Sequence, residues 1–150
     1  MGATYSAQIN ERNVSSAAWE TLIQIVANTR TVRLSEWSVS FQGITTTDAP
    51  VLVQLVRYST AGTSGASVTP GRRNLVASTA DASVNQQFSA EPTVSEILES
   101  HYITPTGGLF VYQYPEDAEV LATAGERLGL RVNPPTSSVD CAANFAWDEL

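Results

Sequence analysis

The sequence lacks several residue types, and each absence excludes a class of structure or chemistry. Its 150 residues include no lysine, one cysteine, one histidine and one methionine. A single cysteine cannot form a disulfide within the chain, and a single histidine cannot head a typical zinc site. No apolar run approaches the roughly 20 residues that a helix needs to cross a bilayer, and the N-terminus does not have the basic and then apolar layout of a signal peptide. We therefore expect no metal, no membrane partner and no disulfide.

Positive charge is also scarce. Eight arginines stand against fifteen acidic residues, which gives a formal net charge of -7. Nucleic-acid binders need a basic surface to release counterions from phosphate, so we expect no nucleic-acid partner. Arginine makes oriented, bidentate contacts better than lysine does. The exclusive use of arginine is therefore consistent either with protein–protein contacts or with compositional drift.

Recognisable catalytic motifs are missing. His101 is the only imidazole, and in a triad it would need a nucleophile and an orienting carboxylate nearby. Serines are abundant, so an enzyme such as a glycan esterase or lyase is the third of three hypotheses. The carboxylates of Glu96 and Glu99 are typical of solvated surface. The sequence predicts a protein that is not an enzyme and binds no cofactor.

The clearest pattern that is present lies near the C-terminus. Apolar residues alternate with small or polar ones at Val139, Cys141, Ala143, Phe145 and Trp147. Successive side chains of a β-strand point to opposite faces, so this segment predicts a strand with one apolar face. Cys141 lies on that face, and we expect a buried, unreactive thiol.

The same two-residue rhythm recurs along the chain. Between residues 31 and 42 the alternation changes phase, which predicts a β-bulge near Ser35 and Glu36. Residues 14–27 fit a helix through one set of apolar residues and a strand through another, and the β-branched residues favour the strand. Further strands are predicted over residues 51–56, 84–88, 97–103, 109–114, 119–121, 128–132 and 139–147.

The connections between these strands carry further expectations. Residues 105–108 have the composition of a hairpin turn. Residues 51–56 are apolar on both faces, so we expect cover on both sides, the second of which can come from another subunit. Residues 59–82 form a long segment rich in small residues, which predicts a functional loop or one shaped by a partner.

About eight or nine short strands in one domain predict an all-β sandwich or a small barrel. Residues 15–150 are expected to form this domain, and residues 1–14 an N-terminal arm. The arm is polar and needs support, either from its own domain or from a neighbour.

Seven short motifs, in this order and spacing, resemble a family of small tailed-phage proteins. They are Val32-Arg33-Leu34-Ser35-Glu36-Trp37, Gly62-Thr63-Ser64-Gly65 with Thr69-Pro70, Glu91-Pro92-Thr93, Pro105-Thr106-Gly107-Gly108, Tyr114-Pro115, Gly125-Glu126-Arg127-Leu128-Gly129-Leu130 and the final Trp147-Asp148-Glu149. The family is that of the capsid decoration, or cement, proteins. The resemblance implies a jelly-roll-like antiparallel β-sandwich, commonly a homotrimer, on the outer surface of a phage head. Its partners would be the major capsid protein and other copies of itself.

Two sets of candidate contact residues follow from this expectation. The arm and the loop over residues 59–74 are too polar to fold alone, so they are the expected capsid contacts, through Tyr5, Ile9, Arg12, Arg72 and Arg73. Aromatic residues are enriched at interfaces, so the expected subunit contacts are Trp37, Tyr58, Tyr102, Tyr112 and Tyr114. The alternative function is a jelly-roll module of a phage tail or fibre that binds a carbohydrate or receptor through these tyrosines.

Overall fold

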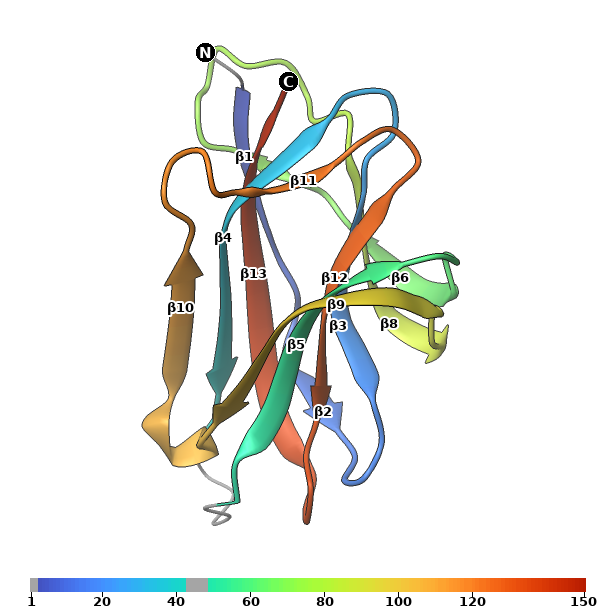
Figure 1. The fold of residues 1–150 in the computed structure, drawn as a ribbon, viewed down its shortest axis with the longest axis vertical. Helices are drawn as coiled ribbons and strands as arrows, with labels where there is room; N and C mark the ends of the chain where they lie inside the picture. Colours follow the sequence, from blue (N-terminus) through green and yellow to red (C-terminus); the bar gives the residue numbers. More distant parts are fainter. Residues whose placement is uncertain (1–2, 43–48) are drawn as a thin grey trace.

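The computed structural model describes residues 3–42 and 49–150, and these form a sandwich of two antiparallel sheets (Figure 1). Sheet A has the strand order β10-β4-β13-β1-β7, with β11 beside β4 and β2 beside β13. Sheet B has the order β6-β8-β3-β12-β5-β9. The all-β, jelly-roll-like sandwich expected from the sequence is confirmed, with thirteen strands among the described residues in place of about eight.

The bounds of the elements are as follows. Sheet A contains β1 (Ala3–Gln8), β2 (Arg12–Val14), β4 (Val32–Phe41), β7 (Gly71–Arg72), β10 (Leu109–Gln113), β11 (Val120–Ala122) and β13 (Val139–Glu149). Sheet B contains β3 (Glu20–Val26), β5 (Val51–Tyr58), β6 (Thr63–Val68), β8 (Ser83–Ala90), β9 (Val94–Ile103) and β12 (Arg127–Asn133). One short 3-10 helix, η1 (Pro105–Gly107), lies between β9 and β10.

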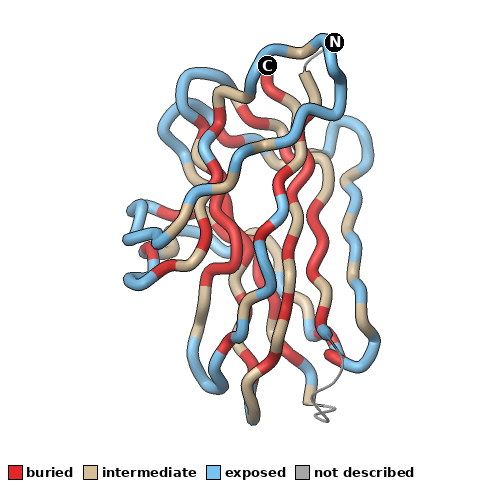
Figure 2. The backbone as a smooth tube through the Cα atoms, turned by 180° about the vertical axis from the view of Figure 1, so that it is seen from behind, coloured by how far each residue is buried: buried red, intermediate tan, exposed pale blue. Residues whose placement is uncertain are grey.

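The core is built from the inward faces of both sheets, as the alternation requires. On β13 the side chains from Val139 to Trp147 at every second position are buried, while Asp140 and Asn144 on the other face are partly exposed. The largest fully buried side chains are Trp37, Trp147, Tyr5 and Phe145. Figure 2 shows buried residues following the long strands and exposed residues in the connecting loops. The predicted two-faced strand is therefore confirmed.

The predicted bulge in β4 is also confirmed. Ala146 of β13 lies opposite Glu36, whereas the next residue, Trp147, lies opposite Leu34, so Ser35 is the extra residue of β4. Because a bulge shifts the alternation by one position, Leu34 and Trp37 both point into the core and are fully buried.

The N-terminal segment is part of sheet A. β1 pairs with β13 on one side and β7 on the other, and β2 also pairs with β13. Of the two supports considered for the predicted arm, the structure shows the chain's own domain. The first two residues of the arm lie outside the described residues.

Three expectations about connections have different outcomes. Residues 20–26 form strand β3, so the choice of strand for this segment is confirmed. The hairpin predicted at 105–108 is wrong: η1 joins β9, which pairs with β5 in sheet B, to β10, which pairs with β4 in sheet A. The long segment over residues 59–82 contains β6 and β7. These two strands pair with segments distant in sequence, so no local pattern marks them.

The outer face of β5 is covered by the chain itself, so a second subunit is not needed there. The Tyr58 ring lies so close to Gly129 of the neighbouring strand that a methyl group added at Gly129 would come within 2.3 Å of the ring. On the same face, the Gln24 side chain donates to the Ala61 carbonyl at 3.5 Å. The side chain of Thr21 donates to Glu91 at 2.5 Å.

Candidate functional site

The exposed large apolar side chains lie mainly on one loop and on strands from both sheets. The large ones among the described residues are Leu75, Val76, Ile97, Tyr102, Leu109, Val111, Leu121 and Leu150. Leu75 and Val76 lie in the loop over residues 73–80, here called the tip loop, and five others lie on β9, β10 and β11. Large apolar side chains that are exposed side by side, as Leu75 and Val76 are, mark interaction surfaces.

The tip loop lies at the same end of the molecule as both chain termini (Figure 1). Leu75 and Val76 are 85% and 89% exposed. They occupy the two central positions of a turn in which the Ala77 amide donates to the Asn74 carbonyl at 3.0 Å. The Arg72 guanidinium closes the turn by donating to the Ala77 carbonyl at 3.1 Å. The turn therefore holds both side chains outward through backbone hydrogen bonds and without packing against them.

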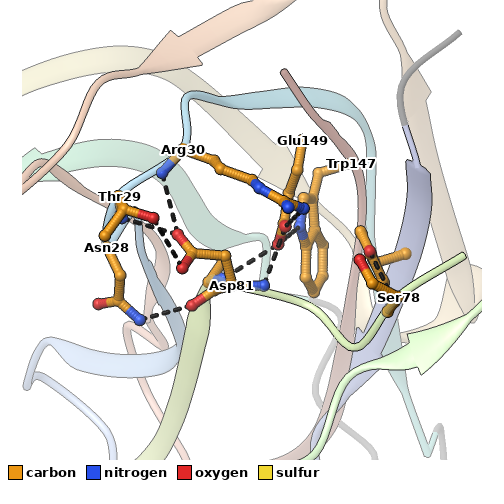
Figure 3. A network of polar contacts seen from close by, with 9 residues as sticks. Asn28, Thr29, Arg30, Ser78, Asp81, Trp147 and Glu149 are labelled. Atoms are coloured by element: carbon orange, nitrogen blue, oxygen red, sulfur yellow. Dashed lines mark hydrogen bonds and ion pairs between the residues drawn. The ribbon is translucent and has the colours of Figure 1, made fainter.

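A buried carboxylate anchors the far end of this loop (Figure 3). The side chain of Glu149 has no exposed surface, and its oxygens accept hydrogen bonds from the amides of Asp81 and Ala82, both at 2.9 Å. The Trp147 indole donates to it at 3.3 Å, and the Arg30 guanidinium lies 3.7 Å away. A buried charge is tolerated only when it is paired and hydrogen-bonded, so Glu149 fixes where the loop leaves the sandwich.

Two more contacts hold the loop. The Tyr5 hydroxyl donates to the Ser78 carbonyl at 2.8 Å. The Asp81 carboxylate accepts from the amides of Thr29 and Arg30, at 2.7 and 2.9 Å. These hydrogen bonds, from Arg30 first and then Thr29, lower the pKa of Asp81. The tip loop is thus connected to β1, to β13 and to the turn before β4.

We expect the Asp81 anchor to fail in acid. A carboxyl whose pKa is lowered by folding stabilises the fold above its unfolded pKa of roughly 3.9, and this contribution disappears as the pH falls through the folded pKa. Asp81→Asn should therefore be less stable than the wild type at pH 6, and the two should converge at an acidic pH below the lowered pKa of Asp81. Urea unfolding midpoints at both pH values measure this, and a difference that is unchanged by pH would contradict it.

The chain segment that contains the tip loop carries positive charge only. Residues 58–80 contain no acidic residue, and their only charges are Arg72 and Arg73, both exposed. A hollow of about 540 Å³ lies on one side of β7, lined by Arg73, Glu36, Asn144 and others. A second hollow, of about 480 Å³, is lined by Arg72 and Leu75. The tip loop and β7, together called the ridge here, contribute residues to both hollows.

The expected capsid contacts fall into two groups. Arg72 and Arg73 are exposed on the ridge. Tyr5, on strand β1, and Ile9, just after it, are buried in the core. This corrects their assignment as capsid contacts, because side chains that point into the sandwich offer a partner no surface. Arg12 is partly buried and pairs with Glu20. Sequence reasoning missed Leu75 and Val76, whose signal was two adjacent large apolar residues in an otherwise small and polar loop.

Exposed Ile97 and Tyr102 lie on the outer face of β9, and exposed Leu109 and Val111 lie on the outer face of β10. These two edge strands, one from each sheet, are here called the β9–β10 side. Just beneath it, rings from both sheets meet. Trp37 and Tyr112 stack with centroids 6.0 Å apart, and the rings of Tyr112 and Tyr114 lie 5.0 Å apart. The structure therefore brings together three of the five residues expected at a subunit interface.

A carboxylate lies at the centre of these rings. Glu99 accepts hydrogen bonds from the Trp37 indole at 3.3 Å and from the Tyr114 hydroxyl. The imidazole of His101 lies 3.5 Å from the same carboxylate. Burial and the Glu99 carboxylate raise the pKa of Tyr114. These contacts join sheet A to sheet B where β9 and β10 lie at the edges of their sheets.

The remaining interface candidates differ in exposure. Tyr102 is 76% exposed and available to a partner. Tyr112 and Tyr114 are partly exposed at the β9–β10 side. Trp37 and Tyr58 are buried within the chain, which corrects their assignment as contact residues. The alternation of β4 points Trp37 inward, and the Tyr58 hydroxyl shares a 2.7 Å hydrogen bond with buried Thr21.

The single thiol should be unreactive in the folded protein. Cys141 is buried on β13, and burial raises its pKa to about 12. Because the thiolate is the reactive form, an aromatic disulfide reagent at pH 8 should label the chain only after it is unfolded in guanidinium chloride. Full labelling of the native protein within minutes would contradict this.

Residues 3–42 and 49–150 contain neither a cluster that could hold a metal ion nor a helix that could cross a membrane. No three His, Cys, Asp or Glu side chains come together there in a way that could hold a metal ion. No helix there is long and apolar enough to cross a membrane.

Comparison of the chain with protein-family models and with curated proteins finds no match. The function of the chain is therefore inferred from the residues and surfaces described above.

Proposed function

We propose that this chain is a structural decoration protein of a tailed-phage head, which binds the outer capsid surface and stabilises contacts between capsomers. The observation that supports this best is the tip loop. It presents two almost fully exposed apolar side chains next to two exposed arginines, on a loop anchored by a buried carboxylate. An anchored loop loses little conformational freedom on binding, which favours affinity. No reaction chemistry is needed for such a role.

The charge of the chain is consistent with this location. A net charge of -7 is repelled by packaged DNA and favours the outside of the shell. The resemblance in the seven sequence motifs points to the same class of protein. Binding at three-fold and quasi-three-fold sites would let one assembly engage several capsid subunits.

We propose that copies of the chain contact one another as a homotrimer through the β9–β10 side. Its exposed apolar residues are suited to side-chain packing. β9 itself contains two bulges and carries Glu96 and Glu99. These features protect an edge strand from pairing with another strand. Three linked tip loops would raise the avidity by roughly 10²–10⁴ over a single one.

The trimer gives a direct prediction. Tyr102→Ala combined with Leu109→Asp should convert a trimer into a folded monomer, because it removes apolar area and adds a charge to the contact surface. Sedimentation equilibrium measures the mass. Leu75→Ser with Val76→Ser is the matched control and should remain trimeric. A wild-type monomer on its own and on heads would contradict the trimer.

The function itself is tested with purified virions and with heads that lack the protein. A decoration protein should appear in a stoichiometry comparable with that of the capsomers and should co-sediment with undecorated heads. Absence from virions, or failure of the wild type to bind heads, would refute the proposal.

One observation favours the second candidate, a carbohydrate- or receptor-binding module of a tail or fibre. Exposed Tyr102 borders a hollow of about 350 Å³ that is also lined by Leu52 and Asn133. Leu52 lies opposite Tyr102 on the neighbouring strand, and Asn133 lies opposite Leu52 on the next strand. An aromatic ring beside a polar amide is suited to a sugar. This function predicts a few copies per virion, and loss of glycan binding in Tyr102→Ala.

A further inference from the structure

On the basis of the proposed function, we infer that the tip loop is received by an apolar recess in a protein partner, with carboxylates at the rim of that recess. The inference concerns the chemistry of the partner surface, which the proposed function leaves open. It depends on charge, on shape and on the way the loop is held.

The arginines of the chain fall into those that pair with its own carboxylates and those that do not. Four arginines pair with carboxylates of the chain itself, namely Arg12, Arg30, Arg33 and Arg57. Arg72 and Arg73 are exposed, and no carboxylate lies within ion-pair distance of them among the described residues. Arg72 uses one of its nitrogens to close the turn, which leaves further donors for a partner. Guanidinium groups bind carboxylates in a bidentate manner, so an acidic rim complements them.

The exposed side chains of Leu75 and Val76 indicate the shape of the site that a partner must offer. They are the adjacent central residues of one turn, and their side chains are almost fully exposed. A convex apolar point needs a concave apolar site to lose its water. Burying both side chains is sufficient for a dominant contact but not for a stable complex alone. The flanking arginines and the two hollows supply the rest of the contact area.

A protein surface fits this ridge better than a lipid surface does. An anionic membrane would repel a chain of net charge -7, and two side chains bury little area in lipid compared with an amphipathic helix. The hollows of about 540 and 480 Å³ beside the ridge can be filled by projections of a folded partner. Loop anchoring by Glu149, Asp81 and Tyr5 suits a partner of fixed shape, because the loop cannot reshape itself to follow another surface.

The test uses the full-length protein and two probes, undecorated heads of the phage that encodes it and vesicles of phosphatidylserine and phosphatidylcholine. Arg72→Gln with Arg73→Gln removes two positive charges. The control, Thr63→Glu with Ser67→Glu, adds two negative charges at exposed positions of β6 and so gives the same net charge. All altered side chains are exposed, and thermal melts confirm that each variant is folded.

We expect the arginine variant to bind heads at least tenfold more weakly than the wild type, and the control to bind within about twofold. Added salt should weaken wild-type binding and leave the arginine variant nearly unaffected. Leu75→Ser with Val76→Ser should lose roughly 100-fold or more. If wild type and both tip-loop variants bind heads equally, the inference fails while the proposed function stands. If the wild type binds vesicles and not heads, both fail.

Discussion

Gly129→Ala is expected to destabilise the protein by about 3–5 kcal/mol. The new Cβ would lie 2.3 Å from the Tyr58 ring and 2.9 Å from the Ile23 carbonyl oxygen. Neither neighbour can move easily, because Tyr58 is buried with its hydroxyl bonded to Thr21 and Ile23 is in the middle of the core. Overpacking costs about 1–3 kcal/mol, and loss of a buried hydrogen bond adds about 1–3 kcal/mol.

Urea unfolding of two further variants isolates the cause. Gly71→Ala is the matched control, since its new Cβ would have its nearest neighbour at 3.7 Å, an ordinary contact, and stability should change by less than about 0.5 kcal/mol. Tyr58→Ser in the Gly129→Ala background removes the clashing ring. The two changes should be clearly non-additive, because residues in contact are coupled. Additive effects would mean that the ring is not what excludes a side chain at position 129.

The outward and inward faces of the long strands could be predicted from sequence because they depend on local alternation. Val139 to Trp147 and the phase change at Ser35 required no knowledge of the partner strand. The turn at 105–108 shows the limit of this approach. Its composition is the same whether the flanking strands pair or cross between sheets, and only the partners of β9 and β10 decide between these arrangements.

The candidate site was harder to predict for the same reason. Tyr5 is buried only because β1 inserts between β13 and β7, which are distant in sequence. The exposure of Arg72 and Arg73 could be predicted, because charge in a polar loop is a local property. Glu149 gave no signal, because an acidic residue next to the C-terminus is usually solvated. Its burial results from a contact with Asp81 and Ala82, 68 and 67 residues away in the sequence.

Glu149→Ala should release the tip loop and cost about 3–5 kcal/mol of stability. The variant leaves the amides of Asp81 and Ala82 and the indole of Trp147 without their acceptor, and unsatisfied buried donors cost about 1–3 kcal/mol each. Glu149→Gln keeps one acceptor oxygen but turns an NH₂ group toward these donors. It should fall between the wild type and Glu149→Ala in urea unfolding.

Because the chain has no lysine, opening of the tip loop can be followed by trypsin cleavage. Trypsin can cleave this chain only after arginine, and Arg72 and Arg73 lie at the start of the tip loop. Under native conditions the wild type should resist cleavage there, because the Arg73 amide donates to the Thr4 carbonyl at 2.9 Å and Arg72 closes the turn. Trypsin should instead cleave Glu149→Ala into two fragments, after Arg72 or Arg73, since local opening exposes the backbone.

Asp148→Asn is the control for this experiment. Asp148 neighbours Glu149 in sequence but faces outward, where it accepts from Thr4 and Arg33 at 2.7 and 2.8 Å. Its loss removes an ion pair that is partly exposed, which costs less than about 1 kcal/mol, and should leave tryptic resistance at the loop intact. Equal protection in Glu149→Ala and the wild type would mean that the turn keeps its shape without the buried carboxylate. Protection lost in Glu149→Ala alone would assign the rigidity of the tip loop to one side chain on the last strand.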